Sequence, residues 1–173
     1  MLNVSDNKNN NPYIKLEDYK SFDYEIPNIF LDFIIEDKRV IVKTELKLIK
    51  KNININSLIL DGIDIFVEKI YLDESLLEEN NYSIQKNRLL IKPILKETFT
   101  LNIVGTIKPK ENFSLLGMYE SNGIITTQCE AEGFRRISYH SDRPDILSKY
   151  KVRIEANKED YPVLLSNGNL VKA

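Results

Sequence analysis

The chain contains very little of the chemistry from which metal sites and nucleophiles are usually built. Its 173 residues include one histidine, His140, and one cysteine, Cys129. A single cysteine cannot form an internal disulfide, which agrees with a reducing compartment. Because zinc is held in proteins by several histidine or cysteine side chains, the chain cannot supply a His-rich or thiolate-rich zinc site. The sequence also lacks an H-E-x-x-H helix, a C-x-x-C pair, a G-x-G-x-x-G turn and a P-loop, so the common metal and nucleotide signatures are excluded.

Excess charge of either sign is also absent. The chain has 24 basic and 26 acidic side chains and a net charge of -2, which gives it no electrostatic reason to bind nucleic acid or an anionic membrane. No apolar run approaches the length of a membrane-spanning helix, and the opening MLNVSDNKNNNPY lacks the basic and apolar regions of a signal peptide. The sequence therefore predicts a soluble cytoplasmic protein with no nucleic-acid partner and no membrane partner.

The length fits one domain. A chain of 173 residues is long enough for a real core and too short for two ordinary domains. Residues 1–12 are rich in Asn and have too little apolar content to pack, and we predict a disordered leader there. Residues 13–173 are predicted to form a single β domain, since no internal repeat and no shift in composition marks a second one.

Hydrophobic residues recur along the chain with the period of a β-strand. Ile29, Leu31 and Phe33 occupy alternate positions, and after the turn EDKR the alternation resumes from Val40 to Leu48, which predicts a hairpin with one buried face. Further strands are predicted over residues 57–60, 64–72, 88–94, 98–107, 150–156 and 162–168. Only residues 73–80 and 143–150 are compatible with a helix, of one or two turns at most. Many short strands without long helices between them predict an all-β antiparallel fold, either a sandwich or an open barrel.

Two interpretations of Cys129 and His140 follow from the residues alone. They are eleven residues apart and could be neighbours across a sheet, where a cysteine and a histidine can form a nucleophile pair. No third residue that would orient the histidine is evident. The structural interpretation makes Cys129 a small buried hydrophobic residue and His140 a turn residue before SDRPD.

One segment carries a more specific signal. TTQCEAEGFRR, residues 126–136, places an amide, the cysteine and two carboxylates in five consecutive residues, and DRPD follows at 142–145. The stretch from Leu115 to Asn169 that contains both resembles the N-terminal domain of bacterial aminopeptidase N, a family of zinc-dependent aminopeptidases of the gluzincin group. The similarity continues more weakly through YEIPNIFLDFII and covers the chain from about Tyr19 onward.

The resemblance implies a fold and a set of partners. In this family the first domain is a saddle-shaped antiparallel β-sandwich domain that packs on a thermolysin-like catalytic domain and forms one wall of the substrate cleft. The zinc lies in the other domain, so the resemblance implies zinc as a cofactor of the parent enzyme and none in this chain. The implied partners are a peptide substrate with a free N-terminus and the catalytic domain of the same polypeptide. The implied reaction is removal of N-terminal amino acids from peptides.

The resemblance also assigns roles to individual residues. It places Glu130 at the position that binds the α-amino group of the peptide, and Gln128 at the position that lines the pocket for the first side chain. No residue of this chain is expected to be catalytic or to bind metal. Glu132, Arg135 and Arg136 are expected to form an ion-pair network. The DRPD segment at 142–145 is expected to form a turn followed by the start of a helix, with the proline where its missing N–H has no consequence.

The chain lacks the catalytic motifs of the family. The G-x-M-E-N motif, the H-E-x-x-H zinc helix, the downstream zinc glutamate and the catalytic tyrosine are all absent, so we expect an excised domain that is inactive alone. The alternative is a stand-alone β-sandwich that binds a protein or a carbohydrate without catalysis. A reading frame that continues beyond Ala173 into these motifs would exclude that alternative.

Overall fold

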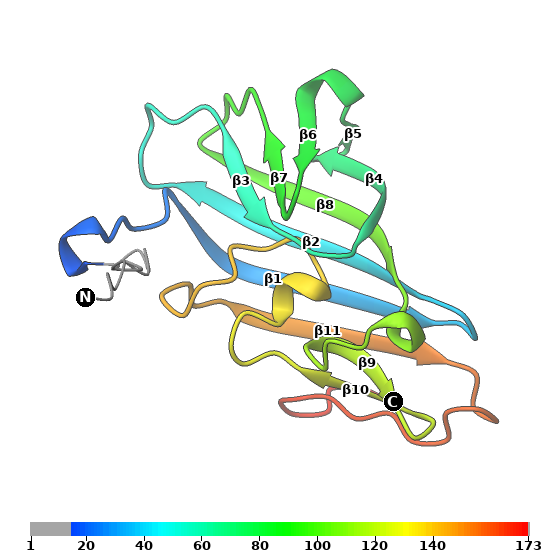
Figure 1. Cartoon of the computed structure of the whole chain (residues 1–173). Coiled ribbons are helices and arrows are strands. Elements are labelled where there is room, and N and C mark those ends of the chain that lie inside the picture. Colours follow the sequence, from blue (N-terminus) through cyan, green and yellow to red (C-terminus); the bar gives the residue numbers. More distant parts are fainter. Residues whose placement is uncertain (1–14, 173) are drawn as a thin grey trace, which may run out of the picture.

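The computed structural model of the chain describes residues 15–172 (Figure 1). The disordered leader predicted over residues 1–12 lies outside the described residues. The described part contains strands joined by turns and by four short 3₁₀ segments. The strands are β1 (Tyr24–Ile35), β2 (Val40–Lys50), β3 (Leu58–Asp61), β4 (Phe66–Leu72), β5 (Ser75–Leu76), β6 (Tyr82–Gln85), β7 (Arg88–Ile91), β8 (Thr98–Ile107), β9 (Gly117–Ser121), β10 (Ile124–Gln128) and β11 (Lys149–Ala156). The 3₁₀ segments are η1 (Leu16–Asp18), η2 (Glu79–Asn81), η3 (Pro109–Glu111) and η4 (Phe134–Arg136). The fold is all-β, as the sequence predicts.

The strands form three sheets. The largest has six strands in the order β11-β1-β2-β8-β4-β5, the second has three in the order β3-β7-β6, and β10 and β9 form a two-stranded hairpin. In Figure 1 the three-stranded sheet lies toward the β4 side of the large sheet, and the hairpin lies toward its β11 edge. Every pairing is antiparallel except that of β11 with β1, which is parallel and places Leu31 opposite Val152.

The alternating pattern of the first two strands produces the predicted hairpin. β1 pairs with β2 in antiparallel register, with Ile35 opposite Val40. The turn between them is closed by a hydrogen bond from the Glu36 backbone N to the Arg39 carbonyl O, at 2.9 Å. Along β2 every second side chain from Val40 to Leu48 is buried. Because successive side chains of a strand point to opposite faces, this period gives the sheet one apolar face.

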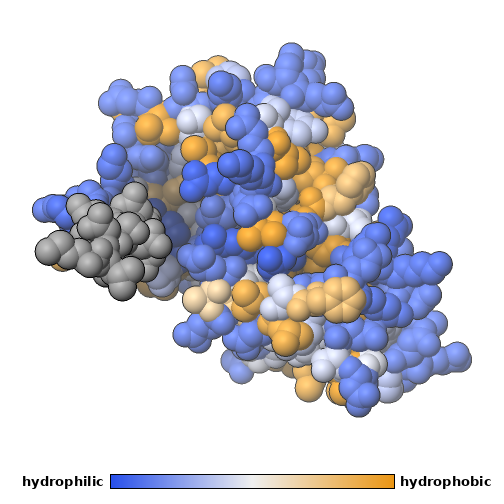
Figure 2. Space-filling view, viewed as in Figure 1, coloured by the Kyte–Doolittle hydropathy of each residue, from blue (hydrophilic) through white to orange (hydrophobic). Residues whose placement is uncertain are grey.

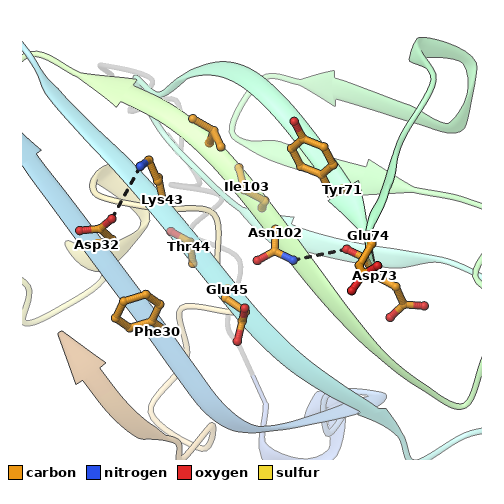
Figure 3. A pocket seen from close by; sticks show the side chains of 11 residues that line it. Phe30, Asp32, Lys43, Thr44, Glu45, Tyr71, Asp73, Glu74, Asn102 and Ile103 are labelled. Atoms are coloured by element: carbon orange, nitrogen blue, oxygen red, sulfur yellow. Dashed lines mark hydrogen bonds and ion pairs between the residues drawn. The ribbon is translucent and has the colours of Figure 1, made fainter. Parts of the chain in front are cut away.

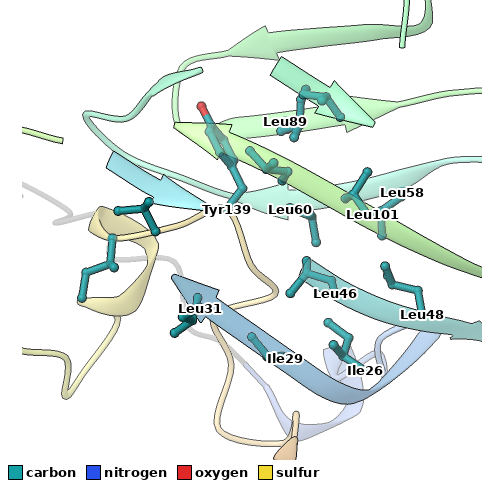
Figure 4. Packing of buried hydrophobic residues seen from close by; sticks show 14 of the residues in the cluster. Ile26, Ile29, Leu31, Leu46, Leu48, Leu58, Leu60, Leu89, Leu101 and Tyr139 are labelled. Carbon is teal, nitrogen blue, oxygen red and sulfur yellow. The ribbon is translucent and has the colours of Figure 1, made fainter. Parts of the chain in front are cut away.

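The core lies between the large sheet and the three-stranded sheet. Figure 4 shows Leu46 and Leu101 of the large sheet on one side of this core, and Leu58, Leu60 and Leu89 of the small sheet on the other. All five are fully buried. Full burial of a leucine stabilises a fold by roughly 1.5–3 kcal/mol relative to exposure, so this layer accounts for the sandwich arrangement of the two sheets.

The structure differs from the sequence-based expectations in three places. Residues 162–168 are not a strand: no strand of the described residues pairs with them, and Leu165 is 85% exposed. Residues 73–80 form β5, a turn and η2 in place of a helix, and residues 143–150 form a turn that leads into β11. Both stretches are too short to nucleate a stable helix, because a first helical turn fixes several residues for a single hydrogen bond. Within residues 15–172 no helix has the length and apolar character needed to cross a membrane.

The hairpin of β9 and β10 is not among the elements predicted from the sequence. These strands are joined at Asn122 and Gly123, which both have positive φ, 50° and 80°. Asn-Gly is the usual pair for a two-residue turn of this kind, so the dipeptide was a signal that could have been used. The hairpin matters because its second strand ends at Gln128, one of the two predicted site residues.

Candidate functional site

The two predicted site residues lie where β10 ends and the chain turns. Gln128 is the last residue of β10, and the side chains of Gln128 and Glu130 are both exposed. The Gln128 side-chain Nε2 donates a hydrogen bond to the Glu130 carbonyl O at 2.9 Å. Among residues 15–172 the Glu130 carboxylate has neither a hydrogen-bond partner nor an ion-pair partner. The Gln128 amide nitrogen is therefore used within the loop, whereas the Glu130 carboxylate has no internal partner among the described residues.

The turn after Glu130 is tightly closed. The Gly133 backbone N donates to the Cys129 carbonyl O at 2.8 Å, and the Glu130–Ala131 peptide bond within this turn is cis. A Cβ atom at position 133 would lie 2.8 Å from the Cys129 Cα, a separation that real side chains essentially never show. Glycine is required at this position because the backbones approach each other so closely.

An ion-pair network holds the segment that follows, as predicted from its charged residues. Arg135 pairs with Glu132 at 3.4 Å, and its Nε donates to the Asp142 Oδ2 at 2.9 Å. Arg136 forms an ion pair with Asp64 in the turn before β4. Asp142 lies only seven residues from Arg135, but the sequence predicts a turn there and not an ion-pair partner. Asp64 lies 72 residues from Arg136, and only the fold brings these two together.

The helix start predicted at DRPD is wrong. Arg143 donates to the Asp145 carboxylate at 2.8 and 2.7 Å, and its guanidinium lies 5.5 Å from the ring centroid of Tyr19. The Tyr19 hydroxyl also donates to Asp145, at 2.6 Å. These contacts fix the N-terminal segment against the turn at 143–145, and the chain then enters β11.

His140 is a buried residue, although the sequence analysis placed it in a turn. It is 4% exposed and forms a β-bridge with Asp61, with backbone hydrogen bonds of 2.8 and 3.0 Å. Its ring packs edge-on against Phe134, with centroids 5.2 Å apart. Both ring nitrogens are buried, and neither has a hydrogen-bond partner among the described residues. Burial lowers the pKa of His140 to about 4, against weaker opposing effects of Asp142, the Ser141 backbone and Asp61.

The structure gives no support to a Cys-His nucleophile pair. Burial, with a smaller contribution from Asp142, raises the pKa of the Cys129 thiol, whereas a nucleophilic cysteine needs a lowered one. No hydrogen bond joins Cys129 to His140 within residues 15–172. Cys129 packs at the edge of the hydrophobic core, which agrees with the structural interpretation.

The described residues do not fit a catalytic zinc ion. In residues 15–172 no group of three or more His, Cys, Asp or Glu side chains is placed to hold a metal. A catalytic zinc site needs three protein ligands and an open position for water. The loop at the end of β10 instead offers one free carboxylate and one amide, a combination suited to binding a cationic group.

A separate concavity of about 400 Å³ lies on the outer face of the large sheet, with Phe30, Asp32, Tyr71, Asp73 and Asn102 among its lining residues (Figure 3). Two of its acids already have cationic partners. The Asp32 carboxylate pairs with Lys43 at 3.8 Å, and Asp73 pairs with Lys96. Neither Gln128 nor Glu130 lines this concavity.

Residues 27–173 match the family model described as the peptidase M1 N-terminal domain. Aminopeptidase N of Haemophilus influenzae is 39% identical over 155 residues, which cover 90% of this chain and 18% of that protein. Aminopeptidase N of Caulobacter vibrioides is 39% identical over 158 residues, which cover 91% of this chain and 18% of that protein. The chain thus spans less than a fifth of the length of the curated relatives it matches.

Solved structures give a consistent comparison. The crystal structure of Legionella pneumophila aminopeptidase A in complex with aspartic acid superposes with a TM-score of 0.84 at 40% identity, covering 92% of this chain and 19% of that one. An M1 zinc metallopeptidase from Deinococcus radiodurans superposes with a TM-score of 0.66 at 13% identity, covering 79% of this chain and 33% of that one. At that low identity the second comparison supports the fold alone.

Proposed function

Because the chain belongs to the peptidase M1 N-terminal domain family, we propose that residues 13–173 form the N-terminal β domain of a longer zinc-dependent aminopeptidase, which removes N-terminal amino acids from peptides. The observation that carries this proposal is the match of residues 27–173 to the peptidase M1 N-terminal domain, together with curated aminopeptidase N relatives at 39% identity. The short share of each relative that the chain covers supports a longer parent protein.

The proposed role of the domain is to recognise the N-terminus of the peptide. An exopeptidase must distinguish a free N-terminus from an internal amide, and the usable difference is one positive charge. Glu130 binds this α-ammonium through a charge-assisted hydrogen bond. Gln128 lies beside it and contacts the first side chain of the substrate, while its amide nitrogen supports the Glu130 carbonyl O.

The zinc of the proposed enzyme is held outside this domain, in the catalytic domain of the same polypeptide, which is also the proposed packing partner. The support for zinc in the parent enzyme is that the similar solved structures include zinc metallopeptidases of the M1 group. The proposed location is the cytoplasm. Its support is the free thiol of Cys129, which forms no disulfide.

If the zinc is held by the catalytic domain, the full-length protein and residues 1–173 alone should differ in zinc content and in activity. The full-length protein is expected to carry about one catalytic zinc per chain and to hydrolyse aminoacyl amides, whereas residues 1–173 alone are expected to do neither. Metal analysis by mass spectrometry and a chromogenic aminoacyl substrate measure both properties on matched samples. Turnover with stoichiometric zinc from residues 1–173 would overturn the domain assignment.

A second prediction concerns the surface that a catalytic domain would cover. Figure 2 shows hydrophobic (orange) residues among the hydrophilic ones on the part of the surface where Figure 1 places β9, β10 and β11. The exposed large apolar side chains of this region and of the segment after β11 include Ile124, Leu147, Val163, Leu165, Leu170 and Val171. Exposed apolar surface and a free strand edge favour association, so residues 1–173 alone are expected to self-associate.

Sedimentation velocity over a range of concentrations measures this directly. The double variant Leu165→Ser/Leu170→Ser is expected to weaken association. Leu16→Ser, which removes an even more exposed leucine at the other end of the described chain, serves as the control. A strict monomer at high concentration would contradict the prediction.

A further inference from the structure

We propose that Arg135 and Asp142 are positioning residues, which hold the loop that presents Glu130 to the substrate amine. The inference rests on the proposed function and names the residues that keep the Glu130 loop in place for it. Within residues 15–172 the Glu130 carboxylate has no hydrogen-bond or ion-pair partner, and the nearby bond from Gln128 reaches the Glu130 carbonyl O instead. The location of the carboxylate is therefore set by the backbone of the loop.

Arg135 fastens the loop to Asp142 by three hydrogen bonds. Its backbone N and its Nε donate to the Asp142 Oδ2 at 3.1 and 2.9 Å, and its Nη2 donates to the Asp142 carbonyl O at 2.9 Å. The two side chains are only 17% and 14% exposed. A partly buried pair is screened by salt much less than a surface pair, and a guanidinium bound at several points has one geometry. The contact thus joins two points of the chain rigidly.

Both sides of this contact are attached to the end of β3. The Ile63 backbone N donates to the Arg135 carbonyl O at 2.8 Å. His140, which shortly precedes Asp142, forms the β-bridge with Asp61. The Arg135–Asp142 pair therefore has a fixed place relative to the core sheets and is not a contact between two free loops.

The turn at Gly133 connects this pair to Glu130. The Gly133 backbone N donates to the Cys129 carbonyl O across the turn, and the turn has no room even for a Cβ atom. A closed turn transmits a shift of Arg135 to the residues on its other side. Arg135 also compensates the charge of Glu132, at 3.4 Å, so Glu130 is the acid of this loop that is left for an external cation.

The test uses the full-length enzyme. Arg135→Gln is expected to lower kcat/KM for aminoacyl substrates about tenfold, because a binding group that is slightly misplaced loses much of its effect. Arg135→Lys keeps the charge without the planar fork and is expected to restore only part of the loss. The matched control is Arg153→Gln, which removes a guanidinium paired with Asp32 at 2.7 Å on the outer face of the large sheet. It is expected to leave kcat/KM unchanged.

A double-mutant cycle with Glu130 distinguishes a positioning role of Arg135 from a general role in the stability of the domain. The double variant Glu130→Gln/Arg135→Gln is expected to lose no more than Glu130→Gln alone, because the amine contact can be lost only once. Losses that multiply, or an Arg135→Gln variant with normal kinetics, would overturn the positioning role and leave the amine site intact. If Glu130→Gln itself has no effect, the proposed function fails, and the positioning role with it. Asp142→Asn replaces Arg135→Gln in the same cycle if the latter does not fold.

Discussion

Replacing Glu130 by alanine or glutamine in the full-length enzyme is expected to lower kcat/KM on aminoacyl substrates by one to two orders of magnitude. A charge-assisted hydrogen bond contributes roughly 1.5–3 kcal/mol, and an ammonium buried without a partner is costly. Because about 1.4 kcal/mol corresponds to a factor of ten in rate, the loss of this contact accounts for an effect of that size. The carboxylate has no partner within residues 15–172, so its removal should not disturb the fold of the domain.

Two further variants separate amine binding from general effects. Glu132→Gln removes the same charge from the same loop, but that carboxylate already pairs with Arg135, so kcat/KM is expected to stay within about threefold of wild type. Gln128→Ala is expected to change the preference among first residues more than the overall rate. If Glu130→Ala and Glu130→Gln both match wild type at unchanged zinc content, Glu130 is an ordinary surface residue.

Acidification is expected to destabilise the domain through His140. The folded-state pKa of about 4 lies below the ordinary value of 6.5, so the unfolded chain binds more protons than the folded one between these two pH values. The stabilisation is therefore complete above about pH 6.5 and is lost as the pH falls toward 4. At 1.36 kcal/mol per pKa unit, the total loss is about 3 kcal/mol.

The variant His140→Leu isolates this effect from that of the paired carboxylates, which are also protonated in acid. Urea unfolding between pH 7 and pH 4.5 gives the free energy of unfolding for both proteins. The wild type is expected to lose more stability than the variant over this range, with most of the difference appearing below pH 6. Equal losses in the two proteins would show that His140 is not buried in its neutral form.

Local pattern was sufficient to predict much of the fold and little of the site. The alternation from Val40 to Leu48 fixes which face of β2 is buried, and it predicts the hairpin with β1 from the residues alone. The direction of a strand and its choice of partner could not be predicted in this way, because they depend on contacts between residues far apart in the sequence. Nothing in residues 150–156 shows that β11 runs parallel to β1, and nothing in residues 162–168 shows that no partner strand is present.

The candidate site depended on resemblance for the same reason. An acid at the end of a strand is usually a solvated surface residue, so Glu130 could not be singled out by composition or spacing. The resemblance identified Glu130 and Gln128 without showing what holds them. The contacts of Arg135 with Asp142 and of Arg136 with Asp64 appear only when the fold brings these residues together.

The most direct measurement of the central claim is a crystal structure of the full-length protein with an amino acid or an aminoacyl inhibitor that carries a free amine. The account predicts that a Glu130 carboxylate oxygen lies roughly 2.7–3.2 Å from the ligand nitrogen, the distance of a hydrogen bond. A ligand amine held entirely by other residues, with the Glu130 carboxylate more than about 6 Å away and beyond the range of a direct charge interaction, would contradict it.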